Sequence, residues 1–147
     1  MTKFVLDNFD DHRGKYIEIW NSTRTPSRII WKQDCASVSY KNVLRGLHGD
    51  HRGCWKLVTC LFGTILVAEA DPLTSQSWTM IMSTGDQILV EPDQALGHLV
   101  LSDTAVFHYK QSQLYDPSAQ FTIKWNDPKY GIKWPITDPI LSERDSA

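Results

Sequence analysis

Residues 42–50, Asn42-Val43-Leu44-Arg45-Gly46-Leu47-His48-Gly49-Asp50, carry the strongest signal in the chain. In a regular strand Arg45 and His48 would point to opposite faces, because neighbouring side chains alternate. Gly46 lacks a Cβ atom and permits a bulge that would turn both toward one cavity. Arginine suits phosphate and histidine takes a proton near neutral pH, so the pair indicates a site for a phosphorylated or nucleotide-linked substrate. The alternative is a surface arginine and a structural, hydrogen-bonded histidine.

The composition predicts one soluble domain covering residues 1–147. Hydrophobic residues make up 41% and charged residues 22%, the balance of an ordinary globular protein. A net charge of -2 gives no reason to expect nucleic acid or a membrane surface as partner. No signal peptide and no apolar run of about 20 residues is present, which predicts a cytoplasmic protein. Three cysteines without a CxxC pair argue against a disulfide framework.

Short extended runs separated by turn residues predict an all-β antiparallel sandwich or barrel. The tail from Asn126 to Ala147 is rich in Pro, Asp and Trp, and it is predicted to form an irregular wrap across the body. Gly63 separates two apolar runs in the manner of a tight hairpin. The expected strands are Lys15–Trp20, Ser27–Trp31, Ala36–Tyr40, Lys56–Phe62, Thr64–Ala70, Trp78–Met82, Gln87–Glu91, His98–Leu101, Ala105–Lys110 and Phe121–Trp125.

A series of short motifs runs in order along nearly the whole chain. They are Asp11-His12-Arg13-Gly14 with Glu18, Gln33-Asp34, Lys41 to His48, Lys56-Leu57-Val58, Gly97 to Asp103, Phe107-His108-Tyr109-Lys110, Tyr115, Ile123 to Pro128, Gly131 to Pro135, and Pro139 to Asp145. Together they resemble the dTDP-4-dehydrorhamnose 3,5-epimerase family. The resemblance implies a cupin-type jelly roll, usually a homodimer, which agrees with the all-β pattern.

The resemblance also implies a chemistry. In a 4-keto sugar nucleotide a base removes a hydrogen beside the carbonyl, and an acid returns a proton to the opposite ring face. His48 matches the base, and Asp145 matches the carboxylate that orients it, so the two are expected within about 2.6–3.2 Å. Lys56 would face the C4 oxygen, where negative charge develops. Tyr109 would be the acid on the far face.

The resemblance assigns a further set of positions to substrate binding, and it requires neither a metal nor an organic cofactor. The residues matching positions that hold the nucleotide diphosphate and base are Arg45, Arg13, Gln33 and Glu18, while Tyr115 helps line the pocket.

The chain departs from the family pattern near the nucleotide end of the expected pocket. The stretch matching Ala95-Leu96-Gly97-His98 usually reads Ala-His-Gly followed by an aromatic residue. Leu96 therefore stands in place of a phosphate-contacting histidine, and His98, on the same side of the strand, would partly substitute for it. The loop after His48 is shorter and carries Asp50, His51 and Arg52. The resemblance with these departures implies a nucleotide-linked 4-keto sugar as substrate, and leaves open whether the nucleotide is dTDP, CDP or GDP and whether one or two carbons are inverted.

Two other functions remain open at this point, a nucleotide-sugar 3,4-ketoisomerase and a non-catalytic sugar-nucleotide-binding jelly roll. Tyr109 and the ending Ser142 to Asp145 favour the epimerase over the ketoisomerase. A metal site built from His48, His51 and His98 is disfavoured, because metal-dependent cupins show HxH followed by a Glu.

Overall fold

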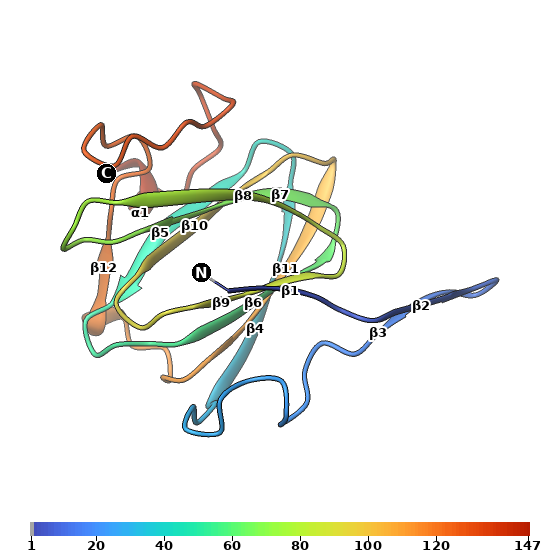
Figure 1. The fold of residues 1–147 in the computed structure, drawn as a ribbon. Helices are drawn as coiled ribbons and strands as arrows, with labels where there is room; N and C mark the ends of the chain where they lie inside the picture. The colour runs from blue at the N-terminus through green and yellow to red at the C-terminus, as the bar shows by residue number, and fades with distance from the viewer. Residues whose placement is uncertain (1) are drawn as a thin grey trace.

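Two five-stranded antiparallel sheets make up the body of the protein in the computed structural model, which describes residues 2–147 (Figure 1). The first sheet has the order β1 (Thr2–Val5), β9 (Asp86–Val90), β6 (Lys56–Phe62), β11 (Thr104–Gln111) and β4 (Gln33–Tyr40). The second has the order β12 (Gln120–Thr122), β5 (Leu44–Asp50), β10 (Ala95–Val100), β7 (Thr64–Ala70) and β8 (Ser77–Ser83). The all-β prediction is confirmed.

Three smaller elements complete the fold. Strands β2 (Asn8–Asp11) and β3 (Gly14–Ile17) form a separate hairpin that projects away from the sheets (Figure 1). A 3-10 turn spans Pro117–Ala119, and the helix α1 spans Glu143–Ser146 close to the C-terminus. The short helix begins at Ser142, whose hydroxyl accepts a hydrogen bond from the amide of Asp145, the usual capping arrangement.

The main core lies between the two sheets, because each strand turns every second side chain inward. Its buried members come from both sheets and are mostly branched aliphatic residues: Val58, Cys60, Ile65, Val67, Met82, Ile88, Val90, Leu96, Val100, Ala105 and Phe107. Toward one end of the strands this apolar filling stops and polar side chains take its place. The change from apolar to polar filling opens the pocket described below.

The outer face of each sheet has its own apolar cover. On the second sheet, Leu47, Ala68 and Ala70 are buried beneath the C-terminal segment, which contributes Trp125 and Trp134. The Trp134 indole Nε1 donates to the Trp125 carbonyl over 2.7 Å. The predicted ordered wrap is therefore confirmed, and burial of its aromatic rings holds it in place. On the first sheet, a smaller cluster around Ile29, Leu57 and Leu89 is covered by Trp20, Trp31, Trp55 and Phe4.

A bulge in β5 brings Arg45 and His48 to the same face of the sheet. Arg45 pairs with His98 of β10 and His48 pairs with Leu96, so two residues of β5 stand opposite the single Gly97. The bulge turns Leu47 outward beneath the tail and His48 inward. Gly46 has φ +113, and a Cβ on it would lie 2.6 Å from both the Gly97 Cα and the Leu96 carbonyl oxygen. The bulge expected at Gly46 is confirmed.

Three local predictions were wrong. Gly63 does not close a hairpin, because β6 and β7 belong to different sheets and Gly63 forms the corner between them. Residues Ser27–Trp31 form turns and loop rather than a strand, since their apolar side chains serve as a cover for the first sheet. The N-terminal strands β1 and β2 were not predicted, and the expected run Lys15–Trp20 overlaps β3 only up to Ile17.

Replacing Gly46 by Ala is expected to destabilise the protein by about 2–4 kcal/mol, because the new Cβ meets rigid backbone and the positive φ becomes strained. Gly131→Ala is a matched control, since Gly131 also has a positive φ of +62 but open space around it, and its cost is about 1 kcal/mol. Urea unfolding of both variants measures the difference. Equal destabilisation would show that the contact with Gly97 does not constrain β5.

Candidate active site

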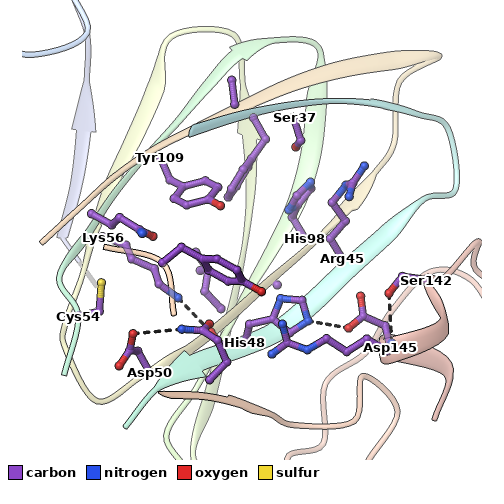
Figure 2. A pocket seen from close by; sticks show the side chains of 18 residues that line it. Ser37, Arg45, His48, Asp50, Cys54, Lys56, His98, Tyr109, Ser142 and Asp145 are labelled. Carbon is purple, nitrogen blue, oxygen red and sulfur yellow. Dashed lines mark hydrogen bonds and ion pairs between the residues drawn. The ribbon is translucent and has the colours of Figure 1, made fainter. Parts of the chain in front are cut away.

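The pocket lies at the polar end of the space between the sheets and has a volume of about 250 Å³. Seven predicted site residues line it, and they come from both sheets, from the loop after β11 and from the tail (Figure 2). These residues are Arg45, His48, Lys56, His98, Tyr109, Tyr115 and Asp145. Positions 100 residues apart in the chain therefore converge on one cavity of a size suited to part of a small ligand.

His48 and Asp145 form the closest polar contact in the pocket. His48 Nε2 lies 2.6 Å from Asp145 Oδ1, while the Gly46 amide donates to Asp145 Oδ2 over 3.2 Å. The predicted pairing is confirmed. Burial tends to raise the pKa of Asp145, but the hydrogen bonds from His48 and Gly46 outweigh it, and the pKa lies below its usual 3.8. An ionised carboxylate only accepts, so Nε2 carries the proton and Nδ1 is free to act as a base.

Lys56 places its ammonium group beside the same histidine. Its Nζ donates to the His48 carbonyl over 3.1 Å, and the side chain enters the pocket from the start of β6 (Figure 2). Burial lowers the pKa of this ammonium from its usual 10.5, and the neighbouring Cys54 and Asp50 offset part of that effect. A desolvated ammonium of this kind interacts strongly with any negative charge that develops next to it.

Tyr109 faces His48 from the opposite side of the pocket. It belongs to β11 of the first sheet, whereas His48 belongs to β5 of the second (Figure 2). Burial raises the pKa of Tyr109 to about 12, with a further contribution from Cys35. The phenol therefore keeps its proton at neutral pH and remains able to donate it. The pocket thus holds a basic nitrogen on one side and a proton donor on the other.

Arg45 and His98 differ in charge although they are paired across β5 and β10. Arg45 is exposed, its Nε donates to Ser39 Oγ over 3.0 Å, and none of the ion pairs among residues 2–147 includes it. His98 is only 3% exposed. Burial, together with the nearby Arg45 and His48, lowers the pKa of His98 to about 3. Arg45 can therefore attract an anion at neutral pH, whereas His98 offers no positive charge to a phosphate.

Three predicted binding residues do not line the pocket of their own chain. Arg13 sits on the projecting hairpin and donates through Nε to Asp11 over 3.0 Å, and Glu18, just after the hairpin, accepts from Arg24 over 3.0 Å. Gln33 lies at the pocket edge, where its side-chain oxygen accepts from the Tyr115 amide over 2.8 Å. Gln33 therefore holds the loop that carries Tyr115.

Several polar residues that were not predicted as site residues also line the pocket. Asp50 is buried and accepts hydrogen bonds from Arg52 and Gln120. Arg144, next to Asp145 in the short helix, adds a second guanidinium and donates to Thr122 Oγ1 over 3.0 Å. Ser37 contributes a buried hydroxyl. The Asp50-Arg52 departure and the motif containing Arg144 were visible in the sequence, but nothing there indicated that they face the cavity.

Within residues 2–147, no three His, Cys, Asp or Glu side chains are arranged to hold a metal ion. Of the three histidines considered for such a site, His51 packs against Phe121 with the ring centroids 4.9 Å apart and does not line the pocket. The same described residues contain no helix long and apolar enough to cross a membrane.

The sequence model of a protein family described as dTDP-4-dehydrorhamnose 3,5-epimerase matches residues 1–147 of this chain. The chain belongs to the dTDP-4-dehydrorhamnose 3,5-epimerase family. It is 36% identical to the enzyme of that name from Escherichia coli, over 93% of this chain and 82% of the relative. It is 33% identical to the one from Salmonella typhimurium, over 95% and 84%. The protein is therefore an isomerase of the epimerase type.

A solved structure supports membership in the epimerase family and the fold. The dTDP-6-deoxy-D-glucose-3,5-epimerase from Legionella pneumophila, in complex with dTDP-4-keto-L-rhamnose, matches with a TM-score of 0.90 and 30% identity, covering 98% of this chain and 84% of that one. The predicted cupin-type jelly roll is confirmed. Because the match covers 98% of this chain, the shared region includes both sheets and most of the C-terminal tail.

The buried ammonium of Lys56 is expected to make the free energy of unfolding vary with pH in the alkaline range. Because burial lowers its pKa in the folded state, the unfolded chain binds more protons between that pKa and 10.5. The free energy of unfolding of the parent should therefore rise, relative to that of Lys56→Met, as the pH increases toward 10. Urea unfolding of both proteins at several values from pH 7 to 10 measures the difference, in which other titrating groups cancel. A difference that does not change with pH would contradict the burial effect.

Proposed function

We propose that the protein inverts C3, C5 or both in a nucleotide-linked 4-keto sugar through an enolate, with His48 as the base and Tyr109 as the proton donor. The observation that carries this proposal is the His48–Asp145 contact of 2.6 Å in a pocket whose other side presents Tyr109. Membership in the epimerase family supports the reaction class.

The first step requires removal of a proton from a carbon next to the ketone. With Nε2 bound to Asp145, His48 has Nδ1 available to accept this proton, and Asp145 stabilises the imidazolium that forms. The electrons of the broken C–H bond move to the C4 oxygen, giving an enolate. Lys56 supplies the positive charge for that oxygen, because its buried ammonium lies beside His48.

The second step returns a proton to the same carbon from the other ring face. Tyr109 stands on the opposite sheet and retains its proton at neutral pH because its pKa is about 12. Delivery of that proton collapses the enolate back to the ketone with inverted configuration. A ketoisomerase shuttles its proton between C3 and C4 on one face, so the opposed placement of His48 and Tyr109 favours epimerisation.

Deuterium exchange from solvent separates these roles. His48→Ala is expected to abolish exchange into the dTDP-, CDP- or GDP-linked 4-keto sugar, because no enolate forms without the base. His51→Ala, an imidazole outside the pocket, is the control and should exchange normally. A non-catalytic binder would show no exchange even in the parent protein, so an inactive parent with all three sugars would contradict the proposed reaction.

Tyr109→Phe is expected to retain part of the exchange while inversion falls about 10²- to 10⁴-fold, because the enolate is then reprotonated from the side it came from. Tyr115→Phe tests the second tyrosine that lines the pocket. Product configuration and deuterium content are measured together by NMR. Equal loss of exchange and inversion in Tyr109→Phe, or a selective loss of inversion in Tyr115→Phe, would remove Tyr109 from the acid role.

The nucleotide diphosphate is proposed to bind Arg45, with Arg144 as a second cation in the pocket wall. Arg45→Ala is expected to weaken binding of dTDP, CDP or GDP about 10- to 100-fold, because charge-assisted hydrogen bonds to phosphate are lost. Leu96→Ala should change binding little, since its side chain donates no hydrogen bond. Calorimetric titration with the three nucleotides measures both variants and shows which base is preferred. Unchanged affinity in Arg45→Ala would refute the assignment.

A homodimer would explain why Arg13 and Glu18 lie outside the pocket of their own chain. The projecting hairpin exposes the rings of Phe9 and Tyr16, whose centroids are 6.3 Å apart and whose planes are tilted by 48°. The outer face of the first sheet also exposes Val38, 63% accessible, together with Tyr40 and Phe62. Such exposed apolar groups mark an interaction surface. We therefore propose that a second copy covers this face and that its hairpin brings Arg13 and Glu18 to the nucleotide.

Val38→Glu is expected to convert this dimer to a monomer, because it places a charge on the apolar face. Leu73→Glu is the control: Leu73 is 86% exposed on the turn before β8, away from the proposed contact. Sedimentation at micromolar concentration measures the mass of each. A parent protein that sediments as a monomer, or a dimeric Val38→Glu variant, would contradict the arrangement.

A further inference from the structure

His98 is a buried polar side chain that the proposed proton transfers do not use. It lies on β10 in the pocket wall, directly across from Arg45 and close to His48 (Figure 2). Only 3% of the residue is exposed.

The ring of His98 is held in one orientation by Phe107. The two rings stack with their centroids 4.0 Å apart and their planes inclined by 10°. In this position Nε2 is buried and has no hydrogen-bond partner among residues 2–147. Leaving such a buried polar atom unpaired costs free energy. A partner from a bound molecule would remove that cost, and the pocket is the space from which it would come.

The charge of His98 restricts what that partner can be. Burial holds its pKa far below neutrality, so the ring has one donor nitrogen and one acceptor nitrogen. A hydroxyl group, which also donates and accepts, matches this pattern, whereas a phosphate requires donors and positive charge. Positive charge in this pocket comes instead from Arg45, Arg144 and Lys56. Ser37 Oγ is a second buried and unpartnered neutral group in the same wall.

We propose that His98 hydrogen-bonds a hydroxyl group of the sugar ring and makes the protein select nucleotide sugars that retain this hydroxyl over their deoxy analogues. The inference rests on the proposed function only in taking a nucleotide sugar as the ligand. A pocket built to bond a hydroxyl discriminates against an analogue lacking it, because its own polar atom is then left unpaired. His98 is thus a specificity-determining residue, and the proton transfers remain with His48 and Tyr109.

The test uses sugars that cannot form the enolate, so that binding is measured apart from reaction. Calorimetric titration compares dTDP, dTDP-glucose, dTDP-2-deoxyglucose and dTDP-3-deoxyglucose. The parent should bind dTDP-glucose about 5- to 50-fold more tightly than at least one of the two deoxy sugars. His98→Phe keeps an aromatic ring on Phe107 but removes both nitrogens, and it should erase that ratio while leaving dTDP affinity unchanged. His98→Gln, which restores a polar atom, should recover part of it.

Several results would overturn the inference. One is a parent that binds the deoxy sugars as well as dTDP-glucose. Another is a His98→Phe variant that keeps the discrimination, or one that loses affinity for dTDP itself to the same extent. A third is a His98→Gln variant that recovers none of the discrimination, because His98 would then act only by stacking on Phe107. If His98→Phe does not fold, His98→Leu removes the same nitrogens. Discrimination without deuterium exchange in the parent would refute the epimerase proposal and leave hydroxyl recognition intact.

Discussion

The close approach of Gly46 to Gly97 is the constraint on which the site depends. The two backbones lie so near that neither strand tolerates a side chain between them. The resulting bulge turns His48 into the space between the sheets and Leu47 beneath the tail. One irregularity thus positions the proposed base and also provides the apolar contact that docks the segment carrying Asp145.

The pocket obtains different chemistry from two histidines by giving them different surroundings. His48 has a carboxylate at 2.6 Å, so a proton gained by its ring would be stabilised. His98 has an aromatic ring on one side and Arg45 nearby, and it remains neutral. Burial also acts differently on the Tyr109 phenol and the Lys56 ammonium. It raises the pKa of Tyr109, which keeps its proton, and it lowers the pKa of Lys56, which binds its proton less strongly.

Sequence reasoning predicted the elements whose signal is local or whose motif is distinctive. The bulge at Gly46 followed from the conflict between strand alternation and two polar side chains, and the His48–Asp145 pairing followed from resemblance. The hairpin at Gly63 failed because apolar runs on either side do not specify which sheet each strand joins. The protonation state of His98 could not be predicted from the sequence, because its neutrality depends on stacking and burial that only the folded chain creates.

The contact between Asp145 and His48 depends on the local stability of the tail. Asp145 reaches His48 from a segment held to the body by aromatic burial, by the bridge between Val43 and Ile140 and by isolated side-chain hydrogen bonds such as that from Arg144 to Thr122. The strands within each sheet are instead joined by extended ladders. Loosening the tail would separate the carboxylate from the imidazole while both sheets stay folded. Under the mechanism proposed above, such a local opening would suppress activity at a lower cost in free energy than global unfolding. Warming or a mild denaturant would then abolish activity before the spectroscopic signal of the β-sheets changes.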